Sequence, residues 1–455
     1  MRTAQPRRAV EGLTRHLQCT TIHLARKSEG RIISVEAASV KPARLAWSFL
    51  ERLGIYPPLA WGFLAVLLLM CACGVESGFL SAYLVSKGIS ASAVALVFTV
   101  YGITATFASW LSGALSDLWG PKRVMIIGLA IWLVFHVSFL LLGVAPSNYS
   151  RMLVFYALRG SGYPLFAYGF LVWITVATPA RNLGTSLGWF WFAFAAGFPT
   201  LGSLIASYLV PSRGTYQTLW WALVFVAAAG LALFSVRDPT GTRRLAPAGE
   251  NPIKTLVFSA TIAWQIPKIG IGGIVRTINT AAQLGFLVFL PVYCTTTVGF
   301  TLTQWLRLLT MLSVTNVIWN LLFGIIGDKF GWRRTVALFG GAGCAITTLM
   351  LYYSMQGRPA NYTLAVVAGM CYGAALSGYT PLGAIMAALA PGRKGAAMSI
   401  LNFGAGASAW LGPGIVGIFL PLLGVGGVMW IFAALYAISA VLTMSMKVPE
   451  DKAAA

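Results

Sequence analysis

Long apolar segments separated by short polar turns form the pattern of this chain from about residue 58 onward. A helix needs roughly 20 consecutive apolar residues to cross the hydrocarbon core of a bilayer, and about twelve segments meet that requirement. The pattern therefore predicts an all-α membrane protein with twelve transmembrane helices. The expected spans are 59–84, 92–115, 123–144, 152–178, 184–209, 218–236, 272–295, 303–326, 335–354, 362–389, 396–421 and 425–446.

One polar turn occurs twice, as GALSDLWGPKR from residue 113 and as GIIGDKFGWRR from residue 324, which is 211 residues later. Its glycines permit a tight reversal, and its aspartate can meet the closing bases. The duplication predicts two related halves. The repeated positions are Gly113, Asp117, Gly120 and Arg123 in the first copy and Gly324, Asp328, Gly331, Arg333 and Arg334 in the second.

Polar stretches at both ends and one long polar break divide the chain. The first stretch is basic and lacks the apolar core of a secretory signal. The expected parts are a disordered cytoplasmic tail at 1–57, a six-helix bundle at 58–236, a cytoplasmic linker at 237–262, a second six-helix bundle at 263–447 and a cytoplasmic tail at 448–455.

The formal net charge of +21 raises the question of a nucleic-acid partner. If both termini are cytoplasmic, 25 of the 32 Lys and Arg residues fall on the cytoplasmic side, four on the outer side and three within helices. This asymmetry is the positive-inside pattern of membrane proteins. It predicts a multi-pass protein of the inner (plasma) membrane with both termini in the cytoplasm, and it favours lipid over nucleic acid as the partner.

Composition excludes several other classes. With 58% hydrophobic and 9% charged residues, the chain is no ordinary soluble domain. Its six cysteines form no CxxC pair, so neither a metal nor a structural disulfide is expected. A phosphate-binding GxxxxGK[ST] motif is missing, and the spans hold no paired carboxylates or nucleophile–base set. We therefore expect no enzyme, no catalytic residues and no cofactor, and we expect a monomer.

Glu76 is the only acidic residue inside a predicted span, where a carboxylate costs several kcal/mol unless it is paired, protonated or hydrated. Arg159 in the fourth span lies at nearly the same depth, so the two side chains can pair. Such a pair is either a structural salt bridge or a proton-coupling pair; no contact at all is the third reading. Arg276 and Arg307 lie within about a turn of predicted helix ends, which favours snorkelling, and His136 is expected to pack or to face lipid.

The polar residues in the spans of the second half are neutral, and two readings remain open for them. They line a substrate cavity, or they form the interhelical hydrogen bonds that are common in membrane bundles. The candidates for the cavity are Asn279 and Gln283 on the seventh span, Asn316 on the eighth, Tyr379 on the tenth and Asn402 on the eleventh.

Two six-helix halves, a duplicated turn after the second and eighth spans and an arginine early in the fourth span resemble the major facilitator superfamily. Within it, the strings LGIYPPLAWGF and GVESGFLSAYLVSKGIS are similar to the polyol permeases, which transport ribitol and D-arabinitol. The resemblance implies alternating access to a central cavity with proton-coupled uptake. It also implies that the residues of the two turns form a conformational latch and that Arg159 is the arginine of the fourth helix.

The function expected first is proton-coupled uptake of a sugar alcohol, a pentitol such as ribitol or arabinitol, with Glu76 as the proton carrier and Arg159 as its partner. The alternatives are an organic-acid (dicarboxylate) permease in which Arg159 grips a carboxylate, a drug-type antiporter and a receptor that transports nothing. Matched depth disfavours the first alternative, because a base neutralised by Glu76 offers little to an anion.

Overall fold

The computed structural model describes residues 50, 55–245, 261–357, 359–391 and 394–448. Helices joined by short turns make up these residues, and no strand occurs among them. Most of the expected N-terminal tail, most of the expected linker and residues 449–455 lie outside the described part. The domain boundaries expected from the sequence therefore remain predictions.

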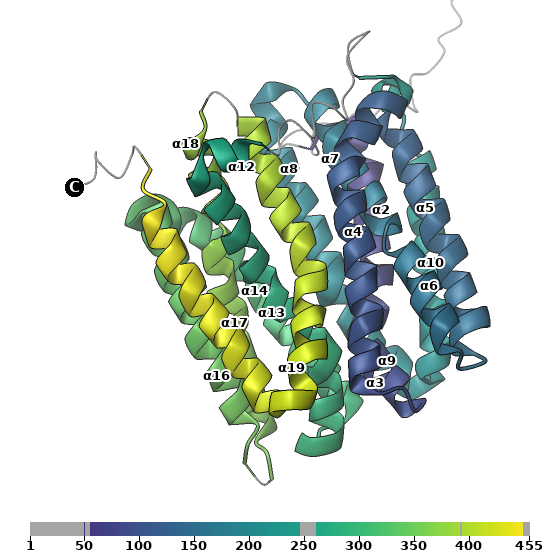
Figure 1. Cartoon of the computed structure of the whole chain (residues 1–455). Coiled ribbons are helices and arrows are strands. Elements are labelled where there is room, and N and C mark those ends of the chain that lie inside the picture. Colours follow the sequence, from purple (N-terminus) through teal and green to yellow (C-terminus); the bar gives the residue numbers. More distant parts are fainter. Residues whose placement is uncertain (1–49, 51–54, 246–260, 358, 392–393, 449–455) are drawn as a thin grey trace, which may run out of the picture. The chain divides into compact units, whose positions relative to one another are not determined.

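The described helices fall in two groups along the chain (Figure 1). The first group comprises α2 (Ala60–Ser77), α3 (Leu80–Ser86), α4 (Ala91–Trp119), α5 (Pro121–Ser138), α6 (Tyr149–Arg159), α7 (Gly162–Ala177), α8 (Ala180–Ala195), α9 (Gly202–Arg213) and α10 (Thr215–Phe234). The second comprises α12 (Ile262–Gln265), α13 (Pro267–Tyr293), α14 (Leu302–Phe330), α15 (Trp332–Thr335), α16 (Cys344–Ser354), α17 (Tyr362–Leu376), α18 (Leu382–Leu389) and α19 (Lys394–Ser445).

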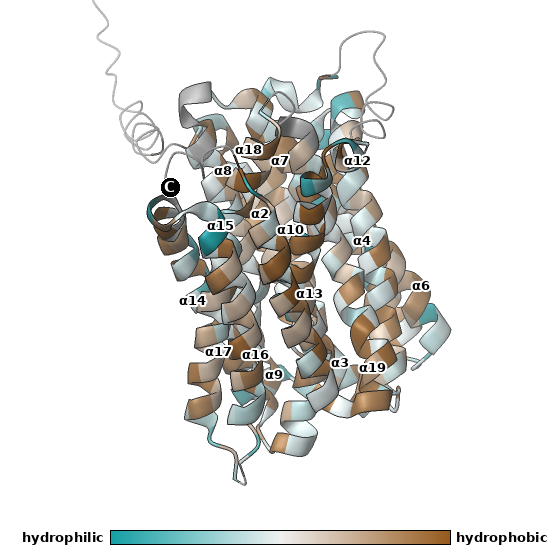
Figure 2. Ribbon diagram, turned by 60° about the vertical axis from the view of Figure 1, so that its left-hand side comes forward, coloured by the Kyte–Doolittle hydropathy of each residue, from teal (hydrophilic) through white to brown (hydrophobic). Residues whose placement is uncertain are grey.

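Ten segments of the described chain are long and apolar enough to cross a membrane, against the twelve that the sequence predicts. One of the ten, Ala397–Ser445, breaks at Gly424 (φ 66°, ψ −173°), between the expected spans 396–421 and 425–446. Helix α14 is not among the ten but has 29 residues, or about 43 Å at 1.5 Å per residue. The structure is all-α, and Figure 2 shows how apolar residues dominate the long helices.

Both copies of the repeated turn reverse the chain at a glycine, as predicted. Gly120 follows α4 with φ 87°, and Gly331 follows α14 with φ 94°, a backbone region that favours glycine. We call the end of the bundle that bears these two glycines the turn face. Helices α3 and α9 lie at the opposite end, at the bottom of Figure 1.

In each of the two turns a base binds the end of a helix. Lys122 Nζ donates to the Val236 carbonyl, just beyond α10, at 2.9 Å, and Arg333 Nη1 donates to the Met444 carbonyl of α19 at 2.9 Å. Cations placed there satisfy carbonyls that a helix terminus leaves free. The carboxylate of Asp117 forms no ion pair with any described residue, so the contact with the closing bases that the sequence allows is not formed in the first turn. The side chain of Asp328 lies outside the described residues.

The two groups of helices contact each other from the end opposite the turn face to mid-membrane. At that end, Ser81 Oγ donates to the Leu287 carbonyl at 2.8 Å, and Trp305 Nε1 donates to the Gly78 carbonyl at 2.7 Å. Further toward the turn face, Thr106 Oγ1 of α4 donates to the Gly406 carbonyl of α19 at 2.7 Å.

Close glycine packing within the second half gives a stability prediction. A Cβ added at Gly412 of α19 would lie 2.1 Å from the Ala281 carbonyl oxygen of α13, whereas one added at Gly414 meets its nearest atom at 3.9 Å. We expect Gly412→Ala to lower the free energy of unfolding by about 1–3 kcal/mol through overpacking, and Gly414→Ala to leave it nearly unchanged. Thermal unfolding of the two variants in detergent measures the difference; equal melting temperatures would contradict this helix packing.

Candidate functional site

Glu76 and Arg159 form a buried ion pair inside the first half. Glu76 is the penultimate residue of α2 and Arg159 is the last residue of α6, with exposed fractions of 2% and 0%. Arg159 Nη1 donates to Glu76 Oε2 at 2.7 Å, and Arg159 Nη2 pairs with Glu76 Oε1. This two-pronged geometry suits a guanidinium and a carboxylate. The contact that matched depth suggested is present, and its role in proton coupling stays a prediction.

Aromatic rings surround the guanidinium. The Arg159 Cζ atom lies 4.3 Å from the ring centroid of Tyr156, 5.1 Å from that of Trp132 and 5.5 Å from that of Tyr101. Ring faces attract a cation, and the effect grows where water is excluded. The cluster therefore holds a charge in the membrane interior by pairing and by aromatic contact together.

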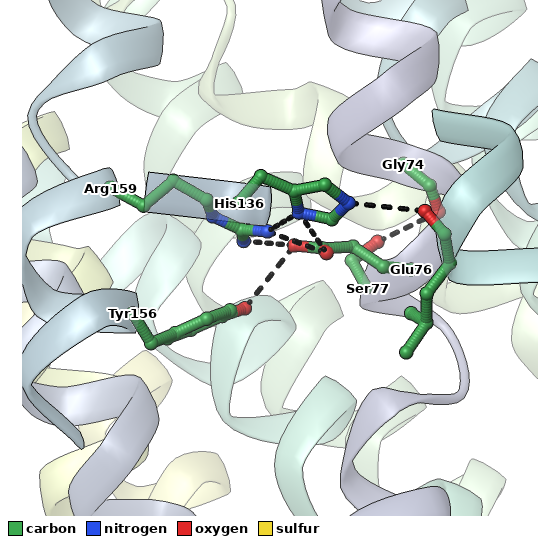
Figure 3. Close-up of polar contacts among 7 residues, drawn as sticks. Gly74, Glu76, Ser77, His136, Tyr156 and Arg159 are labelled. Atoms are coloured by element: carbon green, nitrogen blue, oxygen red, sulfur yellow. Dashed lines mark hydrogen bonds and ion pairs between the residues drawn. The ribbon is translucent and has the colours of Figure 1, made fainter. Parts of the chain in front are cut away.

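His136 belongs to the same cluster, which corrects the expectation that it packs or faces lipid. Its side chain on α5 is fully buried, and its Nδ1 lies 2.7 Å from Arg159 Nη1 and 3.7 Å from Glu76 Oε2. Its Nε2 lies 3.0 Å from the Leu219 carbonyl of α10. Figure 3 shows His136, Arg159 and Glu76 pointing toward one another from three helices.

Arg276 lies further from the start of its helix than the sequence suggested. Helix α13 begins at Pro267 rather than near residue 272, so Arg276 is its tenth residue, about 13 Å along the axis. The side chain is half-buried and forms no ion pair or side-chain hydrogen bond with any described residue. The expected snorkelling of Arg276 therefore stays a prediction, whereas Arg307 is exposed near the start of α14 as expected.

A polar stripe on α13 continues from Arg276. Asn279 and Gln283 follow at three and seven residues, spacings that place all three side chains on one helix face. Asn279 is buried, and its Oδ1 atom has no hydrogen-bond partner among the described residues. A buried acceptor without a donor is costly, so Asn279 is suited to a ligand's donor or to water.

Three tyrosines of the first half lie between this stripe and the buried ion pair, and one of them is near Arg276. Tyr168 of α7 lies within electrostatic range of Arg276, and the hydroxyls of Tyr168, Tyr163 and Tyr101 have no hydrogen-bond partner among the described residues. The Tyr163 and Tyr101 rings stack with centroids 6.2 Å apart, and Tyr101 contacts Arg159. A line of half-buried phenols therefore leads from Arg276 to the buried ion pair.

The other expected cavity residues are placed differently. Asn316 Nδ2 donates to the Gly373 carbonyl at 3.1 Å and to Ser377 Oγ at 3.0 Å, which joins α14 to the α17 region. Tyr379 is buried, and its hydroxyl bonds Ser439 Oγ. Both residues thus make the interhelical hydrogen bonds that the sequence left as the other reading. Asn402 is exposed on α19.

Comparison with known proteins agrees with this architecture. A model of the Major Facilitator Superfamily matches residues 62–319 and 273–455. The chain belongs to the major facilitator superfamily. Among solved structures, this superfamily member is similar to a D-xylose-proton symporter, with a TM-score of 0.67 at 19% identity over 86% of this chain and 97% of that one. At that identity the likeness shows the fold alone.

Two curated members of the superfamily are nearer in sequence. The chain is 45% identical over 403 residues to an alpha-ketoglutarate permease of Bacillus subtilis (strain 168), which covers 88% of this chain and 92% of that protein. It is 35% identical over 404 residues to a D-arabinitol transporter of Klebsiella pneumoniae, at 88% and 95% coverage. The protein is a membrane transporter of this superfamily and not an enzyme. Its resemblance to the polyol permeases is confirmed, because a D-arabinitol transporter is among its relatives.

Removing one partner of the buried pair should destabilise the protein. We expect Arg159→Met to lower the free energy of unfolding by about 3–5 kcal/mol, because it leaves the Glu76 carboxylate buried alone. The double variant Glu76→Gln with Arg159→Met should recover part of that loss. Unfolding in detergent tests this, with the exposed Arg307→Met as control. A double variant no more stable than Arg159→Met would contradict the assigned pairing.

Proposed function

We propose that this chain is a secondary transporter that carries a small organic anion, of the dicarboxylate or 2-oxo acid class, together with protons by alternating access. The observation that carries the proposal is Arg276. It is a cation about 13 Å along a membrane helix, without an acidic partner among the described residues.

The electrostatic argument is direct. Charged residues inside a membrane face a cavity or pair with another charge, because hydrocarbon does not solvate them. The carboxylate of Glu76, the acid that the described spans bury, is already bound to Arg159. An anionic solute between the halves would supply Arg276 with the missing partner, and the planar guanidinium suits a carboxylate in particular. Asn279, Gln283 and the three tyrosine hydroxyls would contact the remaining polar atoms of the solute.

The relatives support this order of solutes without deciding it. The relative at 45% identity is named an alpha-ketoglutarate permease and the one at 35% a D-arabinitol transporter. A sugar alcohol is therefore the second candidate, favoured by that relative and by the neutral amides and phenols of the site. The sequence ranked the polyol first on the resemblance and on the neutral cavity candidates, and it placed the organic acid second because Arg159 is neutralised by Glu76. Arg276 is a separate base, and in this proposal it reverses that ranking.

We further propose that Glu76 takes up and releases the coupled proton. It is buried beside Arg159, and the line of tyrosines joins this cluster to the stripe on α13. The expected halves, 58–236 and 263–447, would rock about the contacts near the end opposite the turn face, with the turn residues as the latch. The turn face would then be the cytoplasmic side.

Replacement of Arg276 tests the anion assignment. We expect Arg276→Gln to weaken competition by alpha-ketoglutarate by about 10- to 100-fold, the loss of one charge-assisted hydrogen-bond pair. Competition by D-arabinitol should change little. Proteoliposome uptake with each competitor measures this, and Arg307→Gln is the matched control. Inhibition of wild-type uptake by pentitols but not by dicarboxylates would overturn the anion and establish the second candidate.

Replacement of Glu76 tests the coupling separately. Glu76→Gln cannot exchange a proton, so we expect it to abolish uphill accumulation driven by a pH gradient while it spares counterflow exchange. Both assays use the same vesicles and the same labelled alpha-ketoglutarate or D-arabinitol. Uphill accumulation retained by this variant would remove Glu76 as the proton carrier and leave the solute assignment intact.

A further inference from the structure

The ion pair between Glu76 and Arg159 does not by itself explain why a histidine, His136, lies beside it. Its Nε2 lies 3.0 Å from the Leu219 carbonyl, and a carbonyl oxygen only accepts hydrogen bonds, so Nε2 carries the hydrogen. Its Nδ1 lies 2.7 Å from Arg159 Nη1, and a guanidinium only donates. With Nε2 protonated, Nδ1 accepts from Arg159, and the imidazole is neutral. The backbone of α10 thereby fixes the tautomer that Arg159 requires.

The surroundings of His136 show which charges act on it. Glu76 of α2 and Arg159 of α6 contact the imidazole directly, and the contact from α10 is the Leu219 carbonyl. Tyr101 of α4 and Tyr156 of α6 contact the ion pair itself, and Cys73 of α2 lies within electrostatic range of that pair. The ring stacks on Trp132 of its own helix with centroids 4.4 Å apart. A second cation on the imidazole would stand 2.7 Å from the guanidinium. Like charges that close in a dry interior exclude each other, so a proton arriving in the cluster goes to Glu76.

We propose that His136 is a positioning residue that keeps Arg159 in place while Glu76 is protonated. In the ionised state, Arg159 donates to both Glu76 and His136 Nδ1. When Glu76 takes a proton from water, its carboxyl becomes neutral and its hold on the guanidinium weakens, but the acceptor at Nδ1 remains. The proton later leaves Glu76 to water on the other side of the membrane. His136 neither gains nor loses a proton in the cycle.

The proposal rests on proton coupling through Glu76 and not on the identity of the solute. Without an acceptor at position 136, protonation of Glu76 would leave the Arg159 guanidinium in contact with aromatic rings but with no hydrogen-bond acceptor on the side of residue 136. The protonated state would then form less readily, and uptake would need a higher proton concentration. A residue at 136 that merely filled space would not move the pH dependence in this way.

Two variants separate these roles. His136→Asn keeps a carbonyl oxygen near Nδ1 and cannot titrate, whereas His136→Phe keeps the ring and its stacking on Trp132 but offers no acceptor. The initial rate of proteoliposome uptake of labelled alpha-ketoglutarate and of D-arabinitol is measured against external pH. Ser138→Ala is the control on the same helix, since the Ser138 hydroxyl bonds the Val134 carbonyl of that helix.

We expect His136→Asn to transport more slowly with the wild-type pH dependence, and His136→Phe to shift the half-maximal pH to the acid side by about one unit. If His136→Phe does not fold, His136→Leu provides the same test. Loss of the pH dependence in His136→Asn would overturn the proposal, because it would make the imidazole a proton carrier. A wild-type profile in folded His136→Phe would also overturn it. Uphill uptake by Glu76→Gln would instead reject the coupling on which it rests.

Discussion

A charge inside hydrocarbon must be paired with an opposite charge, surrounded by polarisable groups or supplied with a partner by a bound solute. Arg159 and Arg276 differ in how this requirement is met. Arg159 is bound by Glu76 and His136, and its Cζ atom lies between 4.3 and 5.9 Å from the centroids of four aromatic rings. Arg276 has neither an ion pair nor a cation–π contact with the described residues. The first arginine is therefore fixed within its half of the molecule, whereas the second has no such partner among the described residues.

The duplication of the chain repeats a physical contact as well as a string of letters. Lys122 and Arg333 are 211 residues apart, as the turns are, and each binds a carbonyl at the end of the last helix of its half, at Val236 and Met444. These contacts tie each half together at the turn face. The hydrogen bonds Ser81–Leu287 and Trp305–Gly78 join the halves at the opposite end. A molecule tied within its halves at one end and joined between them at the other is suited to rocking.

The sequence predicted what depends on local pattern: the long helices, the two glycine turns and the pairing of Glu76 with Arg159, since an acid and a base at equal depth leave few other arrangements. It placed Arg276 too near the start of its helix, because an error of five residues in the start of α13 moves a side chain by about 8 Å along the axis. The place of His136 beside the ion pair was not predicted, because its orientation is set by the backbone carbonyl of Leu219, which no side-chain pattern records. The interhelical hydrogen bonds of Asn316 and Tyr379 within the second half likewise depend on helix packing, which composition does not specify.

Charge balance joins the two arginine sites. With Glu76 ionised, the Glu76–Arg159–His136 cluster is neutral, so among the described side chains of these two sites Arg276 supplies the one uncompensated positive charge. A sugar alcohol with one proton on Glu76 would raise that charge to two, and desolvation makes each additional buried charge costly. A dicarboxylate with the same proton would instead make the sum zero. In the proposed cycle, the transporter that is loaded with both dicarboxylate and proton is therefore electrically neutral when both ends of its cavity are closed. Binding of the solute and binding of the proton then favour each other, because the negative charge of one offsets the positive charge of the other.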